Sequence, residues 1–455
     1  MIKRKGTFRV AWKPIAGGVA LSAVLALAAP IAFAATQPAA AVSATSTPAV
    51  SAAVVKGAAD TQSAPSFTRL GGANREATAI AIANAAYPNG ARTVVLVDGS
   101  QQHFIDALTA VPLAKLLDAP ILLASDTDGQ TPVVSGATQS EIQSLGATTV
   151  YLVGYANTAS VRNTLPKSVQ HVVALQGKNR YETSGLIAKT LLQISGESSF
   201  HTIFVVSGED SHFVDALSAG PFAANMEAPI LLAQSNGALP SQQGYTASVQ
   251  ASYVVGMAGN YAVSVPDPTV IRGDNRYDTS QLLNQQLAEG MAPYKDVIVV
   301  DAADTHLIDA LTVSPYAATL HAPVVMSNDI SASSLPTSTQ DFLSSHYPSA
   351  AHVIVIGGSG SVSDAIGKDV VQRVARQVVP DHFSGQVEAG TETALSFTIK
   401  DGLGHPLEGI PVDFAATGKL DATKNLSTTS AVSDANGNVQ VNLYDTYVGD
   451  QGTVT

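Results

Sequence analysis

The sequence has 455 residues, of which 45% are hydrophobic and 13% are charged, and it contains no cysteine. This length is enough for three or four domains with buried cores, and the lack of cysteine excludes disulfides, zinc–thiolate sites and a cysteine nucleophile. The formal net charge is −12, which argues against binding nucleic acid through bulk charge.

The N-terminus has the pattern of a secretory signal peptide at residues 1–34. Five basic residues precede an apolar stretch at 15–29, and Ala32-Phe33-Ala34 fits a small-x-small cleavage site. The alternative is an uncleaved membrane anchor, but the stretch is shorter than the roughly 20 residues that cross a bilayer. We therefore expect export, cleavage before Ala35, no membrane contact afterwards, and a mature chain with 19 basic and 36 acidic residues, a net charge of −17.

Residues 35–66 are rich in Ala, Ser, Thr and Pro, which predicts a disordered linker. Three repeats follow, which we place at residues 67–170, 171–267 and 268–380. Each begins with a Gly-x-Asn-Arg heptad that ends in threonine, at residues 72–78, 177–183 and 273–279. The heptads are spaced by 105 and 96 residues.

Three further motifs recur in the same order. A His-x-x-Asp-Ala-Leu block occupies residues 103–108, 212–217 and 306–311, and its Asp is followed six residues later by Pro112, Pro221 or Pro315. An Ala-Pro pair with three aliphatic or Met residues occupies 119–123, 228–232 and 322–326. A β-rich run ending in glycine closes each repeat. Each proline removes a helical N–H, so we expect it to kink or restart its helix.

In chain order, the first repeat predicts a helix at 79–87, a buried strand at 93–97, the Asp-Ala-Leu helix, the Pro-Ile-Leu-Leu strand, a short helix at 140–145 and a strand at 149–153. Such alternation predicts an α/β fold, a mostly parallel sheet with helices on both faces. From residue 385 to 455 the pattern changes to period two with turn signals, which predicts an all-β sandwich. This segment ends in a strand-like run, so we expect the chain to be truncated there.

The arginine of the heptad is the least ordinary residue of the repeat. Asparagine suits a helix N-cap, but a cation at a helix N-terminus opposes the macrodipole and needs a partner. One interpretation is an ion pair with the aspartate of the same or the next repeat, Asp106, Asp215 or Asp309. The other is an anionic ligand held by arginine and the helix N–H groups.

The remaining motifs have ordinary structural interpretations. His103 and Asp106 lie one helical turn apart, as an acid/base pair might, but no nucleophile accompanies them, and we interpret the three aspartates as structural. The Ile-Leu-Leu strands are typical of a core, although their ends could offer an aliphatic surface to a sugar. Residues 434–438 predict a hairpin turn rather than a calcium loop, so we assign no metal, no cofactor and no catalytic residue.

These motifs resemble the cell wall-binding repeat type two family of Gram-positive bacteria over residues 67–380. The resemblance implies three α/β modules around a pseudo-threefold axis, attached non-covalently to an anionic wall polymer, such as a teichoic acid-like or secondary wall polysaccharide, with the Ile-Leu-Leu strands implicated. An arginine of the family pattern stands at Arg69, but Ala174 and Val270 replace it in the later copies. Residues 385–455 resemble bacterial Ig-like domains of the invasin and intimin type, which serve as stalk spacers.

The motifs and the resemblance together define a set of expected ligand-binding residues. They are Arg69, Asn74, Arg75, Thr78, Asn179, Arg180, Thr183, Asn275, Arg276, Thr279, Ile121, Leu122, Leu123, Ile230, Leu231 and Leu232. The favoured hypothesis is a non-catalytic cell-surface protein of undetermined oligomeric state. The alternatives are the tethering region of a wall hydrolase, an amidase or protease whose catalytic domain lies beyond the sequence, and an adhesin that binds through the Ig-like segment.

Overall fold

The structure is a computed structural model that describes residues 50–55, 67–100, 103–124, 132–209, 217–256, 263–288, 295–303, 306–328, 334–346, 352–381, 387–388, 390–446 and 451–454. The expected signal peptide and its cleavage site lie outside these residues. Inside the expected linker, β1 (Val50–Val55) is a strand. Among the described helices, none has the length and apolar character that a membrane crossing requires.

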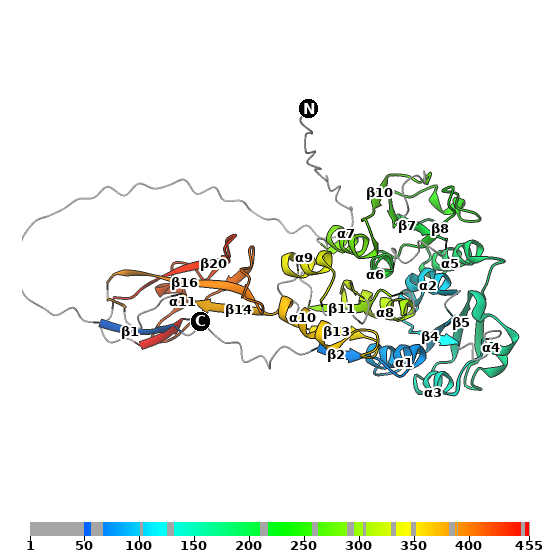
Figure 1. Cartoon of the computed structure of the whole chain (residues 1–455), viewed down its shortest axis with the longest axis horizontal. Coiled ribbons are helices and arrows are strands. Elements are labelled where there is room, and N and C mark those ends of the chain that lie inside the picture. The colour runs from blue at the N-terminus through cyan, green and yellow to red at the C-terminus, as the bar shows by residue number, and fades with distance from the viewer. Residues whose placement is uncertain are drawn as a thin grey trace, which may run out of the picture. The chain divides into compact units, whose positions relative to one another are not determined.

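Three α/β modules follow one another along the chain (Figure 1). Module 1 comprises α1 (Arg75–Ala86), β3 (Thr93–Asp98), α2 (Phe104–Leu116), β4 (Ile121–Ala124), α3 (Gly136–Ser144), β5 (Thr149–Val153), the 3₁₀ helix η2 (Gly154–Ala156), α4 (Ala159–Thr164) and β6 (His171–Leu175). Module 2 comprises α5 (Arg180–Ser195), β7 (Thr202–Ser207), α6 (Ala219–Asn225), β8 (Ile230–Ala233), the 3₁₀ helix η4 (Gln243–Thr246), β9 (Ala251–Val255) and β10 (Pro268–Ile271).

Module 3 is assembled from two distant parts of the chain. It comprises α7 (Arg276–Ala288), β11 (Asp296–Asp301), α8 (Leu307–Leu320), β12 (Val324–Ser327), α9 (Thr337–His346), β13 (His352–Ile356), α10 (Asp364–Val374) and the N-terminal strand β2 (Phe67–Leu70). Each module holds a four-stranded parallel sheet, ordered β4-β3-β5-β6, β8-β7-β9-β10 and β12-β11-β13-β2. The predicted α/β fold with parallel sheets is confirmed.

The module boundaries fall one strand later than the sequence motifs suggested. β6 and β10 precede the second and third heptads, yet they pair with β5 and β9 of the preceding module. β2 precedes the first heptad and pairs with β13, so the start of the first expected repeat completes the sheet of the third. The modules therefore close into a ring through backbone hydrogen bonds between β2 and β13.

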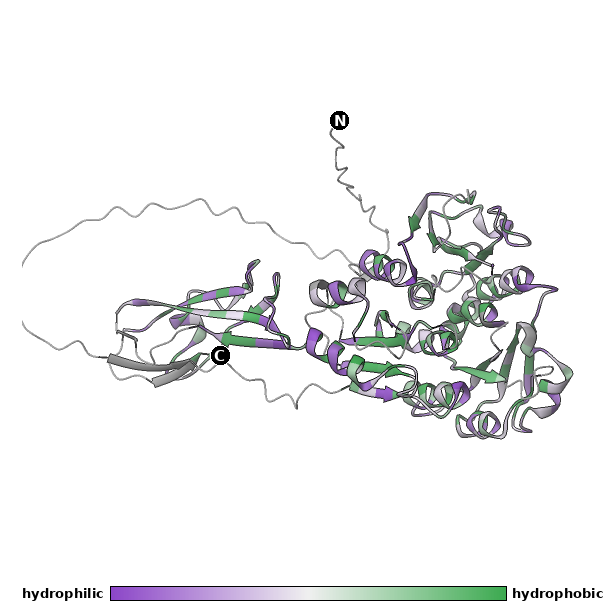
Figure 2. Ribbon diagram, in the orientation of Figure 1, coloured by the Kyte–Doolittle hydropathy of each residue, from purple (hydrophilic) through white to green (hydrophobic). Residues whose placement is uncertain are grey.

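The Asp-Ala-Leu helices form the common core of the ring. α2, α6 and α8 each pack against the other two, and their hydrophobic ribbons lie together in Figure 2. A helix that is apolar on all sides must be buried, and α8 has Leu307–Pro315 and two further alanines buried. Buried residues of all three modules merge into one cluster around these helices, so the modules share a core. Module 3 adds a second cluster on the other face of its sheet, between the sheet and the helices α9 and α10.

The prolines do not restart the helices as we expected. α2 and α8 continue through Pro112 and Pro315 as single helices of 13 and 14 residues. The lost backbone hydrogen bond is tolerated because both helices are held on all sides by the buried core. In module 2, α6 begins at Ala219 and contains Pro221 in its first turn, and residues 210–216 lie outside the described residues.

The chain after α10 is built from β-strands and carries its own core. β14 (Arg376–Pro380), β16 (Glu392–Asp401) and β20 (Asn438–Tyr444) form an antiparallel sheet. A second sheet joins β15 (Val387–Glu388), β1, β21 (Gln451–Val454) and β18 (Ala416–Gly418), and β17 (Pro411–Asp413) pairs with β19 (Ser430–Val432). A short helix, α11 (Ala422–Asn425), completes the segment. β14 therefore belongs to this region and not to the third repeat, where we had placed it.

Candidate functional site

The heptad is used for local folding in all three modules. The side-chain oxygens of Asn74, Asn179 and Asn275 accept hydrogen bonds from the backbone N–H three residues later, at 2.9–3.0 Å. The hydroxyls of Thr78, Thr183 and Thr279 accept from the N–H of the heptad glycine at 3.0–3.2 Å. Both residue types that we expected to bind a ligand thus have intramolecular partners.

The heptad glycine is required by close packing of this turn. A Cβ at Gly72, Gly177 or Gly273 would lie 2.3 Å from the Cβ of the residue five positions later. The three threonines are at most 2% exposed. The heptad therefore starts its helix at one fixed position, and this position determines where the arginine points.

The three arginines occupy equivalent positions at the carboxyl ends of the central strands. Arg75, Arg180 and Arg276 donate from Nη1 to the backbone oxygens of Gly99, Gly208 and Ala302, at 2.5–2.8 Å. These carbonyls follow β3, β7 and β11 directly. Each arginine is half-buried, and each therefore satisfies a carbonyl at the edge of its own sheet.

Arg75 also faces the neighbouring module. Its positive charge favours the ionised form of Asp309 in α8, and α1 packs against α8. Burial nevertheless raises the pKa of Asp309 to about 7, and nearby Asp301 acts in the same direction. The charge of Arg75 thus reaches an aspartate of another repeat at the junction that closes the ring, and an ion pair between the two side chains stays a prediction. Asp215 lies outside the described residues.

The aspartates of the Asp-Ala-Leu helices lie against glycines at strand ends. A Cβ on Gly154 would lie 1.8 Å from Oδ2 of Asp106, and one on Gly357 would lie 3.1 Å from Oδ2 of Asp309. Both glycines have positive φ, 55° and 91°. The glycines that follow β5 and β13 are explained by this close approach, because any side chain would displace the buried carboxyl group.

A second pair of aspartates, which was not predicted from the sequence, lies at the ends of two central strands. Asp98 and Asp301 end β3 and β11, are 2% exposed, and accept hydrogen bonds from the N–H groups two residues later, those of Ser100 and Ala303. Nδ1 of His306 lies 2.6 Å from Oδ2 of Asp301. An aspartate at the end of an otherwise apolar strand was the signal available in the sequence.

The hydrophobic strands offer no aliphatic side-chain surface in this structure. The side chains of β4 and β8 that we expected to contact a ligand are at most 1% exposed: Ile121, Leu122, Leu123, Ile230, Leu231 and Leu232. They form the core beneath α1 and α5. Direct contact of these strands with a polymer remains a prediction, which now requires that a ligand reach their ends.

Arg69 differs from the other expected ligand residues because it joins two ends of the ring. It donates to the Gly357 oxygen at 2.9 Å and to Oδ1 of Asp364 at 2.7 Å, and its guanidinium lies over the ring of Phe67. Asp364 is in the first turn of α10, where a carboxylate also favours the helix dipole. Arg69 therefore fastens β2 to module 3.

The three α/β modules repeat the same helix caps and the same arginine–carbonyl contacts, which defines a tandem-repeat protein with three equivalent modules. Within the described residues, no group of three or more His, Asp or Glu side chains is placed to hold a metal ion. The family model of cell wall binding domain 2 (CWB2) matches residues 69–162, 174–265 and 270–367, more than half of the sequence. The chain belongs to this family, and its three modules are cell wall-binding repeats.

Two proteins of Bacillus subtilis contain regions that are similar in sequence to this chain. The chain is 36% identical over 170 residues to the amidase enhancer of Bacillus subtilis, covering 37% of this chain and 22% of that protein. It is 31% identical over 237 residues to the N-acetylmuramoyl-L-alanine amidase LytC of the same organism, covering 49% and 43%. The chain thus spans less than half the length of these relatives.

Solved structures share the fold. Cwp6 from Clostridium difficile matches with a TM-score of 0.58 and 21% identity over 72% of this chain and 51% of that one. Cwp8 from the same organism matches with a TM-score of 0.54 and 23% identity over 68% and 52%. At these identities the likeness shows the fold of the modules.

Proposed function

We propose that this protein attaches non-covalently to an anionic polymer of the bacterial cell wall through its closed ring of three modules. The match of all three repeats to a cell wall-binding family carries this proposal. The attachment places the chain at the cell surface, after export directed by residues 1–34. The segment from residue 385 acts as an Ig-like spacer or adhesive domain, and its separate hydrophobic core supports this role.

The charge of the chain constrains how an anionic polymer is bound. The mature sequence carries a net charge of −17, so long-range attraction to an anionic wall is unfavourable. Binding is therefore local, through individual cations and sugar contacts. We expect binding to persist at moderate salt, because salt screens the general repulsion together with the local attraction.

The experiment is co-sedimentation of the purified mature protein with isolated walls, before and after extraction of the anionic polymers. Binding that is lost on extraction supports the proposal. Equal binding to extracted walls would instead indicate attachment to peptidoglycan, and a steep loss between low and physiological salt would indicate a basic patch.

A second candidate function is the tethering of a wall hydrolase. The similarity to about half of an amidase favours it. In that case the modules keep their wall-binding role and direct a catalytic domain to its substrate. Hydrolysis of purified walls by the full-length protein distinguishes this role from attachment alone.

A further inference from the structure

Module 2 differs from the other two modules in the segment between β8 and β9. The equivalent segments lie between β4 and β5 in module 1 and between β12 and β13 in module 3. Modules 1 and 3 place a helix there, α3 of nine residues and α9 of ten. Module 2 has only the four-residue 3₁₀ helix η4. The shorter segment covers less of α5 than a full helix would, and it leaves a hollow over the first turns of α5.

A buried side chain fixes the shape of this segment. Gln242 is 0% exposed, and its amide bonds to both backbone groups of Leu232 and to the hydroxyl of Ser184, each at 2.8 Å. The backbone oxygen of Ser241 comes so close to α5 that a Cβ on Gly185 would lie 3.0 Å from it. The hollow is therefore held by a satisfied polar network and does not depend on mobile side chains.

The position of Gly185 is specific to module 2. Counting from the heptad threonine, the equivalent residues are Ile80 in module 1 and Gln281 in module 3. Neither side chain would leave room for the close approach of a segment such as that at Ser241. The second heptad position differs as well, with Lys178 in module 2 where modules 1 and 3 have Ala73 and Asp274.

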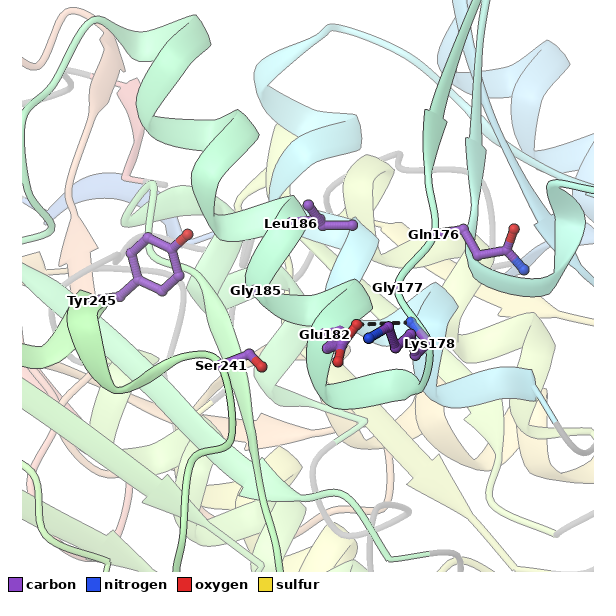
Figure 3. A pocket seen from close by; sticks show the side chains of 8 residues that line it. All are labelled: Gln176, Gly177, Lys178, Glu182, Gly185, Leu186, Ser241 and Tyr245. Atoms are coloured by element: carbon purple, nitrogen blue, oxygen red, sulfur yellow. Dashed lines mark hydrogen bonds between the residues drawn. The ribbon is translucent and has the colours of Figure 1, made fainter.

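The hollow is a pocket of about 580 Å³, within the range of small-ligand sites. Figure 3 shows Tyr245 on one side, Leu186 on α5, and Lys178 and Glu182 at the helix start. Leu186 is 37% exposed, and Tyr245 rests edge-on against Phe200. The Glu182 carboxylate accepts from the Lys178 N–H at 3.0 Å, which fixes it at the rim.

We propose that this pocket binds one sugar unit of the anionic wall polymer. A sugar ring has apolar C–H faces and polar hydroxyl edges, which match an aliphatic and aromatic surface bordered by a few polar groups. Leu186 and Tyr245 contact the ring, Glu182 and Ser241 bond its hydroxyls, and the Lys178 ammonium binds the anionic substituent. The inference rests on the proposed function and assigns the sugar contact to module 2.

The first experiment compares wall binding of matched variants of the mature protein. Lys178→Ala should weaken binding roughly tenfold, as expected for a charged hydrogen bond, whereas Lys189→Ala, a change of an exposed lysine on the same helix, should not. Leu186→Trp fills the pocket and should weaken binding at least as much. Leu282→Trp is the control, because Leu282 occupies the same repeat position in α7 and is 42% exposed.

The second experiment probes the pocket without the wall. ¹⁵N–¹H spectra of the mature protein are recorded with N-acetylglucosamine 1-phosphate, with N-acetylglucosamine and with inorganic phosphate. The proposal expects shifts in α5 and η4 with the sugar phosphate, smaller shifts with the sugar, and loss of both in Leu186→Trp. Equal shifts with phosphate alone would overturn the sugar assignment in favour of a simple anion site.

The outcomes separate this proposal from the proposed function. If the wild type binds walls and both pocket variants bind equally well, the pocket proposal is wrong and wall attachment stands. If the wild type does not bind walls, the proposed function fails, and the spectra then decide whether the pocket takes a sugar at all.

Discussion

The three junctions between modules are built alike, yet only one joins distant parts of the chain. β6 and β10 follow β5 and β9 closely in sequence, so they remain tethered to the sheets they complete. β2 pairs with β13 although Arg69 and Gly357 are 288 residues apart. Closing so long a loop costs more conformational entropy than closing a short one, and the non-covalent junction must offset this cost with its own contacts.

The side chains of the closing junction reflect this difference. Arg69 bonds to Gly357 and Asp364 there, whereas Ala174 and Val270 hold the same position in β6 and β10. Val270 is 65% exposed. The comparison gives a structural reason why the arginine is present in only one of three repeats, because only the closing junction joins strands that are distant in sequence.

The largest effect should come from removing β2. A mature protein that starts at residue 71 lacks the strand, exposes the edge of β13 and opens the ring. We expect its Tm to fall by roughly 5–10 °C, since each kcal/mol moves Tm by about 2–4 °C in a domain of this size. A protein that starts at residue 67 is the control. Thermal unfolding of both measures the effect, and equal Tm values would contradict closure by β2.

A smaller loss is expected from the arginine at the same junction. Arg75→Ala removes a charged hydrogen bond to the Gly99 oxygen and one of the cations that act on Asp309, and it should destabilise the protein by about 1.5 kcal/mol, the scale for a hydrogen bond to a charged group. Arg180→Ala makes the same change at a tethered junction. Hydrogen exchange should show release of β13 amides in the first variant and not in the second. Equal protection of β13 in both would show that the closing junction is not special.

The pH dependence of stability tests the Asp309 carboxyl group. Its folded pKa is raised from 3.8 to about 7, so between these values the folded state binds more protons than the unfolded one. Its contribution to stability is therefore full below about pH 4 and is lost as pH rises through about 7. We expect the free energy of unfolding, measured with urea, to be lower at pH 8 than at pH 5 in the wild type, and this difference to shrink in Asp309→Asn. If the difference between the two pH values were unchanged in Asp309→Asn, another group would be responsible for the pH dependence.

The smallest effect should come from the side chain of Arg69. Arg69→Ala removes an ion pair whose Asp364 partner is 63% exposed, and such pairs are worth at most about 1 kcal/mol. Val270→Ala, at the same position of β10, should change nothing. Chemical denaturation of both variants gives the comparison. A large loss for Arg69→Ala would mean that its bond to the Gly357 carbonyl dominates the junction.

The sequence by itself determined the number of modules, their α/β class and the order of their elements. Hydrophobic periodicity and the heptad cap are local properties, and the helix start at Arg180 follows from Asn179 and Thr183 alone. That each heptad arginine has a partner was also anticipated, because a cation at a helix N-terminus requires one. The partners in the structure are backbone oxygens of the same module, and a pair with an aspartate of another module stays a prediction.

Only the tertiary structure decided which sheet each strand enters and what the repeated polar residues do. Strand pairing depends on contacts between distant segments, so β2 could not be assigned to module 3 from local patterns. Burial of Ile121 and Ile230 follows from the packing of α1 and α5 above them, which a strand pattern does not contain. The pocket of module 2 likewise arises where Gly185 meets the segment at Ser241, two positions whose proximity exists only in the folded chain.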